Sequence, residues 1–256
     1  MIWEKADIET DRVREISERY GLDLLAAAIL VRRGITEGPE VKYYIESELR
    51  YVHSPFLFEE MEDAVDRIIR AKVEGEKILV YGDRDVDGIT SVALIVETLE
   101  QLGIPVQWRV PMGDDPYGLS IAEIERFAAE DGTLIVAVDC GTTNTAEIER
   151  AVELGVDTIV VDHHNPQENL PPAVAVVNPK LSDSAYPFDG LCACALSAKL
   201  RQALAFAVTP AYGEVVCLVN ARPGNDTIII DAVKLQNMVE VDRLTETIAP
   251  GNITPE

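Results

Sequence analysis

The sequence predicts an α/β fold, a parallel sheet with helices on both faces that follows a short helical N-terminal region. After residue 77, short apolar strands alternate with amphipathic helices, which is the pattern of strands joined by helical crossovers. Three of these strands end in carboxylate or imidazole side chains. Because right-handed crossovers bring the ends of parallel strands to one edge of a sheet, these side chains are expected to meet there.

The first 70 residues show helical spacing rather than strand alternation. We expect helices over 11–20, with Thr10 as the N-cap, and over 22–33, followed by two more. Acidic residues outnumber basic ones in this region, so packing onto the sheet is favoured over nucleic-acid binding. The apolar face of the last of these helices consists of Met61, Val65, Ile68 and Ile69.

From Lys77 onward the apolar period changes to that of a sheet with crossover helices. The strands are expected at 77–81, 105–110, 134–139, 157–161 and 173–177. The intervening helices are expected at 90–102, 120–130 and 144–154. We therefore divide the chain into a helical N-terminal region (1–70), an α/β domain (71–210) and a divergent C-terminal segment with a linker (211–256). We expect this last segment to be a truncated part of a longer region.

The strand at Lys77–Val80 runs into three carboxylates at alternate positions, Asp83, Asp85 and Asp87. Three carboxylates this close repel one another unless a cation lies among them, which favours a hard divalent ion. The alternative is an acidic turn that caps the following helix, because aspartate is also favourable near a helix N-terminus. Gly88 then leads into that helix.

Two later strands end in further residues of the metal-ligand type. One ends in Asp139, and the next ends in Asp162, His163 and His164. The chain has three histidines, and two of them are adjacent here. Carboxylates together with neutral imidazoles suit Mn²⁺ or a similar ion better than an all-oxygen Mg²⁺ site. The three strand ends together favour a two-cation centre that hydrolyses phosphoesters over a purely structural arrangement.

These three motifs resemble those of the DHH phosphoesterases. The first is Gly-Asp-Arg-Asp-Val-Asp-Gly over 82–88, the second is Asp139-Cys-Gly-Thr, and the third, which gives the family its name, is Asp162-His163-His164. Within the family the chain looks most like the N-terminal part of the RecJ single-strand exonucleases, over residues 49–204. The resemblance implies phosphodiester hydrolysis with two ions, Mn²⁺ or Mg²⁺.

The expected roles of the ligands follow from a two-cation mechanism, in which the ions lie about 3.5–4 Å apart and activate a bridging water. Asp139 is the expected bridging ligand. Asp85 and Asp87 would hold one ion each, and His163 would ligate from the other side. Asp83 is expected to be a further ligand or a base close to the metal.

Other residues are expected on the substrate side of this centre. The resemblance implies that His164 faces the scissile phosphate, and Asp162 is expected to orient an imidazole through its free ring nitrogen. A turn at a helix start is the alternative for both. Thr142 and Thr143 could bind a phosphate at the start of the next helix or cap that helix. Arg84 could contact phosphate or be solvated.

The chain departs from the family at the fourth motif, where relatives have a metal-binding aspartate in an apolar helix. The corresponding apolar run is Glu214–Arg222, which ends in arginine, and Asp226 lies in a predicted turn. A strand-like run follows at 225–234. Neither the family's second substrate-binding domain nor the oligonucleotide-binding barrel of RecJ enzymes is present. This favours a piece of a longer protein over a stand-alone domain.

The formal net charge of −23 counts against a self-sufficient nucleic-acid binder, because such binding depends on lysine and arginine. The four cysteines form no Cys-x-x-Cys pair, which favours buried free thiols in a reducing compartment over a zinc site. The N-terminus lacks a signal-peptide pattern, and no apolar run reaches the ~20 residues that span a bilayer. A cytoplasmic protein without a membrane partner is expected.

We therefore expect an enzyme that degrades single-stranded DNA from the 5′ end and acts in DNA repair and recombination. Its expected partners are single-stranded DNA or a short oligonucleotide, and further C-terminal domains of the same polypeptide. One alternative is a phosphodiesterase for short oligonucleotides or cyclic dinucleotides. The other is a non-catalytic replication scaffold that has lost the fourth metal motif, which Arg222 favours and the three intact motifs oppose.

Overall fold

The computed structural model describes residues 8–46, 48, 52–225 and 227–249. The described chain divides into two compact units, with the boundary between His53 and Ser54. The three-region division expected from the sequence stays a prediction. No helix in the described ranges is both long and apolar enough to cross a membrane.

The first unit is a small helical body with its own apolar core. It consists of α1 (Thr10–Tyr20), α2 (Leu24–Arg32) and α3 (Gly38–Ile45). Its core is formed by Val13, Ile16, Ala27, Leu30, Ile35 and Val41.

The helix starts in this unit differ from the expected ones by one or two residues. Thr10 is the first helical residue of α1 and not its N-cap, which is Glu9. The second helix begins after Asp23, whose side chain accepts hydrogen bonds from the backbone N–H groups of Leu25 and Ala26. This carboxylate satisfies N–H groups that would otherwise have no partner in the first turn, so it sets the helix start.

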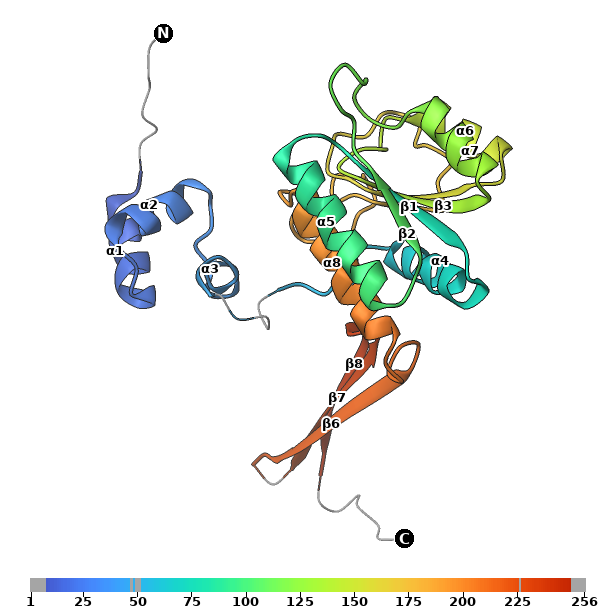
Figure 1. The fold of residues 1–256 in the computed structure, drawn as a ribbon. Helices are drawn as coiled ribbons and strands as arrows, with labels where there is room; N and C mark the ends of the chain where they lie inside the picture. The colour runs from blue at the N-terminus through green and yellow to red at the C-terminus, as the bar shows by residue number, and fades with distance from the viewer. Residues whose placement is uncertain (1–7, 47, 49–51, 226, 250–256) are drawn as a thin grey trace, which may run out of the picture. The chain divides into compact units, whose positions relative to one another are not determined.

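The second unit contains a five-stranded parallel sheet, as the sequence predicts (Figure 1). The order of its strands is β2-β1-β3-β4-β5. Its strands are β1 (Lys77–Gly82), β2 (Val106–Arg109), β3 (Gly132–Val138), β4 (Asp157–Val161) and β5 (Ala175–Val177). Its helices are α4 (Met61–Glu74), α5 (Val86–Gln101), α6 (Ile121–Ala129), α7 (Thr145–Glu153) and α8 (Ala193–Ala207), and a short 3-10 helix, η2, spans Pro55–Leu57.

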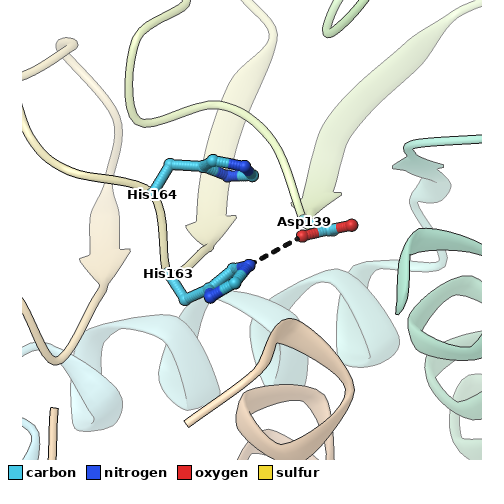
Figure 2. Close-up of side chains that lie close together, drawn as sticks. All are labelled: Asp139, His163 and His164. Atoms are coloured by element: carbon cyan, nitrogen blue, oxygen red, sulfur yellow. Dashed lines mark ion pairs between the residues drawn. The ribbon is translucent and has the colours of Figure 1, made fainter. Parts of the chain in front are cut away.

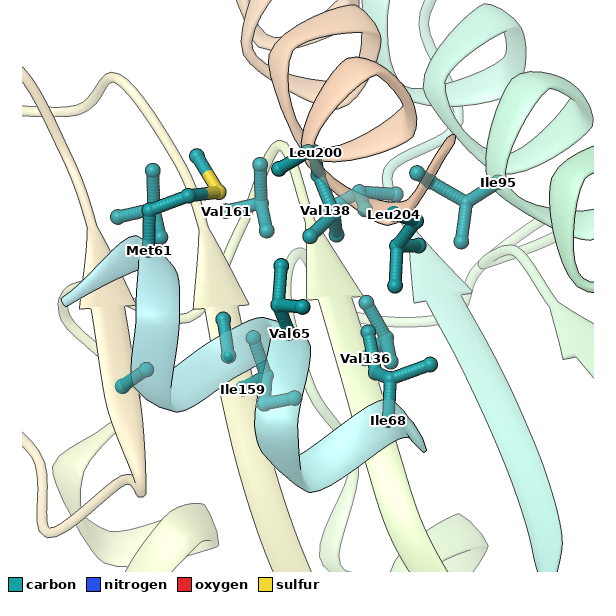
Figure 3. Close-up of a cluster of buried hydrophobic side chains, with 14 of the residues drawn as sticks. Met61, Val65, Ile68, Ile95, Val136, Val138, Ile159, Val161, Leu200 and Leu204 are labelled. Carbon is teal, nitrogen blue, oxygen red and sulfur yellow. The ribbon is translucent and has the colours of Figure 1, made fainter. Parts of the chain in front are cut away.

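Helices cover both faces of this sheet, which confirms the predicted architecture. Alternate strand residues point to opposite faces. On one face, residues such as Val136 and Val161 pack against α4, α5 and α8 (Figure 3). On the other face, residues such as Ile135 and Val160 pack against α6 and α7. Each fully buried aliphatic side chain of this kind contributes about 1.5–3 kcal/mol, so the two layers hold the strand ends in a fixed register.

The helix after the first motif begins four residues earlier than expected, at Val86 instead of residue 90. Asp85 is its N-cap and accepts a hydrogen bond from the N–H of Gly88 at 3.0 Å. Asp87 therefore lies in the first helical turn. The strand-like alternation of the three aspartates ends at Asp85. The direction of the Asp87 side chain is therefore set by the helix and not by the strand.

A three-stranded antiparallel sheet follows α8, in the order β6-β7-β8 (Figure 1). Two contacts tie it to α4, because Tyr212 donates a hydrogen bond to Asp66 at 2.7 Å and Asn237 donates one to Glu62 at 2.5 Å. The apolar run 214–222 lies almost entirely in β6, so it forms a strand and not the helix that the resemblance implied for the fourth motif. Asp226 lies outside the described residues. The strands are β6 (Val215–Pro223), β7 (Ile228–Gln236) and β8 (Val239–Ile248).

All four cysteines are free thiols. Cys140 is buried, as expected, but the expectation fails for the other three. Cys192 and Cys217 are exposed, and Cys194 is partly exposed.

Candidate metal centre

The carboxyl ends of four parallel strands place the motif residues at one level of the sheet. Gly82, Val138, Val161 and Val177 are successive register partners in β1, β3, β4 and β5. The residues that come next in each strand are therefore neighbours at this edge. They are Asp83, Asp139, Asp162 and Asn178.

Among the described residues, two groups of side chains at this edge could hold a metal ion. The groups are Asp83, Asp85 and Asp139, and Asp139, His163 and His164, with the potential ligand atoms of each group within 4.8 Å of one another. Figure 2 shows the second group, in which Nε2 of His163 lies 3.3 Å from Oδ1 of Asp139. Asp139 belongs to both groups, which is the arrangement a ligand shared by two cations needs.

Two carboxylate oxygens at this edge are buried without a hydrogen-bond partner, Oδ1 of Asp83 and Oδ1 of Asp139. The residues are 5% and 2% exposed. The contact from His163 to Asp139 lacks hydrogen-bond geometry, so it does not satisfy this oxygen. A buried polar atom without a partner is costly, and a divalent cation would satisfy both oxygens. The side chains at this edge therefore fit the metal that the motifs imply.

The turn after β3 gives Asp139 its position. The backbone of Asp139 is left-handed, with φ of 58°, which costs about 1–2 kcal/mol in a residue with a side chain. Gly141 follows with φ of 112°, and a Cβ there would lie 2.9 Å from a methyl group of Val160. Strain of this kind persists where the surroundings hold the residue in place, and it is common at functional sites.

The carboxyl group of Asp139 is shifted toward its neutral form. Burial, together with the nearby carboxylates of Asp87 and Asp85, raises the pKa of Asp139 to about 7. A cation binds the ionised carboxylate, so protons and metal compete for this group. We expect the affinity for Mn²⁺ to rise with pH up to about 7.

The raised pKa predicts how pH affects the stability of the metal-free protein. The group ordinarily ionises near 3.8, so its contribution to stability is fully present below that pH and is lost as pH rises toward about 7. We expect the unfolding free energy to fall by on the order of 2–3 kcal/mol between pH 5 and 8 relative to Asp139→Asn, which cannot ionise. Urea unfolding of both proteins in EDTA tests this, and equal pH slopes would contradict it.

Asp162 stabilises the third motif by accepting hydrogen bonds from backbone N–H groups. Its Oδ1 accepts hydrogen bonds from the backbone N–H groups of His163 at 2.7 Å and His164 at 3.2 Å, and its Oδ2 accepts one from Thr142 at 3.1 Å. The ring Nδ1 of His164 also lies 2.7 Å from Oδ1. Burial alone would raise the pKa of Asp162, but the hydrogen bonds from Thr142 and His164 outweigh it and lower the pKa.

The contact with Asp162 orients the ring of His164 toward Tyr117. The Tyr117 hydroxyl lies 3.2 Å from Nε2 of His164 and donates a hydrogen bond to the carbonyl oxygen of Asp139, also at 3.2 Å. Burial and the charge of Asp162 raise the pKa of Tyr117, so this hydroxyl keeps its proton. The His164 side chain remains 44% exposed, so it can reach a ligand at the edge.

Asp87 is placed differently from the other motif residues and belongs to neither ligand group. Its two oxygens accept hydrogen bonds from the backbone N–H groups of Ala193 and Cys194, each at 2.8 Å. These N–H groups are at the N-terminus of α8, where a negative charge is stabilising. Asp87 thus connects α5 to α8, although its Oδ2 also lies 3.6 Å from Nε2 of His163.

Besides His164, three residues were expected to contact phosphate, and they differ in exposure. Thr142 is fully buried and its hydroxyl accepts a hydrogen bond from Asn178, which argues against contact with a substrate through its side chain. Thr143 is exposed. Neither threonine caps α7, because its N-cap is Asn144. Arg84 is exposed and donates a hydrogen bond to the carbonyl oxygen of Gly113 at 3.0 Å.

Asn178 is a site residue that lies outside the three motifs. It is 1% exposed, and its side-chain amide donates hydrogen bonds to the Thr142 hydroxyl at 3.1 Å and to the carbonyl oxygen of His164 at 2.9 Å. It therefore links the second and third motifs. The signal available in the sequence was its position directly after the strand that ends at Val177.

Gly88 allows the loop of the first motif to close over β1. A Cβ at Gly88 would lie 2.4–2.7 Å from backbone atoms of Asp83, which must then move. We expect Gly88→Ala to lower stability by about 1–3 kcal/mol and to weaken Mn²⁺ binding measured by calorimetry. Gly103→Ala, beyond the other end of α5, is the control. It strains the backbone at φ of 74° but meets no atom within 4 Å, so its Mn²⁺ affinity should match the wild type. Equal affinities in all three proteins would contradict the prediction.

A model of the DHH family, N-terminal domain, matches residues 77–221. The chain is 33% identical over 205 residues to the single-stranded-DNA-specific exonuclease RecJ of Bacillus subtilis, covering 80% of this chain and 26% of that protein. It is 33% identical over 248 residues to the RecJ of Dickeya dadantii, covering 91% of this chain and 42% of that protein. The chain thus spans between a quarter and somewhat over two fifths of the length of these two relatives.

Two solved structures share the fold. The crystal structure of exonuclease RecJ bound to manganese is 30% identical, with a TM-score of 0.55, and the match covers 60% of this chain and 40% of that one. The crystal structure of RecJ from Thermus thermophilus in complex with Mn²⁺ is 27% identical, with a TM-score of 0.60, and the match covers 79% of this chain and 28% of that one.

Proposed function

The chain belongs to the DHH family, and from this we propose that residues 54–256 form the metal-binding part of a two-cation phosphodiesterase that degrades single-stranded DNA from its 5′ end. The observation that carries the proposal is the position of Asp139 in both groups of metal-ligand side chains. The relatives named as single-stranded-DNA-specific exonucleases support the substrate, and the solved structures that contain manganese support the metal. A role in DNA repair and recombination accords with such an activity.

The proposed ligands divide between the two ions around Asp139. Asp83 and Asp85 would hold one ion together with Asp139, whose unpaired buried oxygen such an ion would satisfy. His163 and Asp139 would hold the other. The ions, Mn²⁺ or Mg²⁺, would polarise a phosphoryl oxygen and lower the pKa of a bound water.

The remaining side chains position these ligands and the substrate. Asp162 fixes the orientation of the His164 ring, which leaves that half-exposed imidazole directed at the scissile phosphate. Asp87 holds α8 against the start of α5 and keeps a negative charge near His163. Without cations, the clustered carboxylates would repel a phosphodiester. Hydrolysis is therefore expected to require added Mn²⁺ or Mg²⁺ and to stop in EDTA.

Degradation of end-labelled DNA tests the proposal. With Mn²⁺, we expect release of mononucleotides from the 5′ end of single-stranded DNA and little release from a blunt duplex. The Asp139→Asn variant should release nucleotides at least about 10²-fold more slowly. The matched control is Asp114→Asn, an exposed aspartate in the loop after β2, which should retain full activity. Release from the 3′ end would refute the polarity. A preference for substrates of two to four nucleotides would replace the substrate class with short oligonucleotides.

A second candidate function is a non-catalytic scaffold, and one observation favours it. The run 214–222 forms the exposed strand β6, and Arg222 donates a hydrogen bond to Asp231 within the small antiparallel sheet. In the described residues this run contributes no side chain to either ligand group. If the protein binds Mn²⁺ but hydrolyses neither long nor short single-stranded DNA, the scaffold is the better description.

A further inference from the structure

The two outer strands of the small antiparallel sheet differ in how they are protected. The strand order β6-β7-β8 leaves β6 and β8 as edges. Every residue of β6 is exposed, so no described element covers this strand. The unpaired N–H and C=O groups of an edge strand can pair with another strand, and proteins commonly block this with charged side chains.

Charges protect β8 and not β6. Four of the ten residues in β8 are charged, namely Glu240, Asp242, Arg243 and Glu246. In contrast, β6 opens with five successive apolar residues and has one charged residue, Arg222, near its end. In that apolar run Val219 is 65% exposed and Leu218 is 56% exposed. A long apolar edge of this kind is a site for strand addition.

We propose that β6 pairs antiparallel with β6 of a second copy of this chain, with Leu218 opposite Leu218 of that copy. Two charges, one just before β6 and one near its end, select this partner and this register. Glu214 lies four residues before Leu218 and Arg222 lies four residues after it. In an antiparallel pair centred on Leu218, each Glu214 is therefore opposite the Arg222 of the other copy.

Other registers lose this complementarity. A parallel pair in register would set Arg222 against Arg222 and Glu214 against Glu214. Moving the centre by one residue, to Cys217, would set Glu214 opposite Asn220 and leave Arg222 opposite Tyr212. Opposite charges directly across a strand pair are favourable and like charges are unfavourable. The paired stretch 214–222 also ends before Pro223, which has no N–H to donate.

The pairing joins two three-stranded sheets into one of six strands. Its interface is a single strand pair about 30 Å long. Such a pair buries less surface than the ~1,000 Å² typical of stable complexes, so the dimer forms only at high protein concentration. The net charge of −23 on each copy opposes association. Salt near 0.15 M screens this repulsion beyond about 8 Å and screens the paired end charges much less. The inference does not depend on the metal centre.

Sedimentation of charge variants tests the partner and the register together. The wild type is expected to show a concentration-dependent dimer at about 0.1–0.5 mM in 0.15 M salt, the ionic strength at which long-range repulsion is screened. Glu214→Arg and Arg222→Glu should each be monomeric, because each sets like charges opposite one another at both ends. An equimolar mixture of the two variants should form a heterodimer, because both of its end pairs are then Arg with Glu.

The mixture also distinguishes the loss of strand pairing from damage to the fold. Arg222→Glu loses its contact with Asp231 as well, but a variant that is merely unfolded would not associate when it is mixed with Glu214→Arg. Circular dichroism of each variant provides the control for folding. A wild type that stays monomeric at 0.5 mM, or variants that dimerise as the wild type does, would overturn the proposal.

Cysteine cross-linking provides a second measurement of the register. Leu218→Cys, in a Cys217→Ser background, places two cysteines opposite each other, where directly paired residues have Cα atoms about 4.5–5.5 Å apart. Mild oxidation should give a covalent dimer. Val216→Cys in the same background is the matched control, because position 216 lies opposite Asn220 and the two introduced thiols are therefore four residues out of register. Equal cross-linking of both variants would overturn the proposed register.

Discussion

Replacing Asp139 by asparagine is expected to reduce Mn²⁺-dependent phosphodiester hydrolysis by at least about 10²-fold. Metal ions contribute several kcal/mol to stabilisation of the transition state, and each 1.36 kcal/mol is a factor of ten in rate. Because Asp139 belongs to both ligand groups, its loss affects both ions, whereas loss of Asp85 affects one group. The measurement is the initial rate of nucleotide release at saturating Mn²⁺.

Stability distinguishes this loss of activity from unfolding. Asparagine keeps the size of the side chain and removes the cost of burying a charge, so the metal-free variant should be at least as stable as the wild type at pH 8. Asp85→Asn is the companion variant, with a smaller expected loss of rate. If Asp139→Asn retains more than a tenth of the wild-type rate, the assignment of Asp139 as the shared ligand is wrong.

Asp162→Ala is expected to cost at least about 3 kcal/mol of stability, because it leaves three backbone N–H groups without their acceptor, each worth about 1–3 kcal/mol when buried. The N–H groups belong to Thr142, His163 and His164. The variant also frees the ring of His164, and removal of a group that orients a ligand typically lowers affinity or activity 10–100-fold.

The asparagine variant at this position provides a graded comparison. Asp162→Asn keeps Oδ1 for the two histidines but sets an amide N–H₂ group against the N–H of Thr142, so an intermediate loss is expected. Urea unfolding of the three proteins gives the order of stability. If the alanine variant is within 1 kcal/mol of the wild type, Asp162 does not organise the third motif.

The sequence was sufficient to predict the sheet and its functional edge, and physical rules explain why. Apolar strands alternating with helices specify parallel order, and parallel order brings the strand ends together. Asp83, Asp139 and Asp162 follow residues in direct register, so their proximity required only the strand boundaries. These boundaries were clear because each strand is a short run of mostly buried, mostly apolar residues.

The sequence was not sufficient to tell the three aspartates of the first motif apart. Their alternate spacing suggested that Asp85 and Asp87 each hold one ion, but the helix begins at Val86 and Asp87 accepts hydrogen bonds from the start of α8. That partner lies 106 residues away in the chain, and no local pattern reports it. Burial of Thr142 likewise depends on Asn178, which comes from a different strand end.

The C-terminal region shows how a family pattern can mislead. The apolar run 214–222 occupies the place of a helical motif, and it forms an edge strand instead. Its β-branched residues Val215, Val216 and Val219 favour a strand, as does the turn chemistry of the Pro-Gly-Asn stretch that follows it. Local propensity was the better guide here than position relative to the third motif.

Anomalous diffraction from crystals grown with Mn²⁺ tests the central claim most directly, namely that Asp139 is the ligand shared by two cations. We predict two anomalous peaks, both within coordination distance of the Asp139 carboxylate, one on the side of Asp83 and Asp85 and the other on the side of His163. A single peak, or two peaks of which one has no contact with Asp139, would contradict the account of this centre.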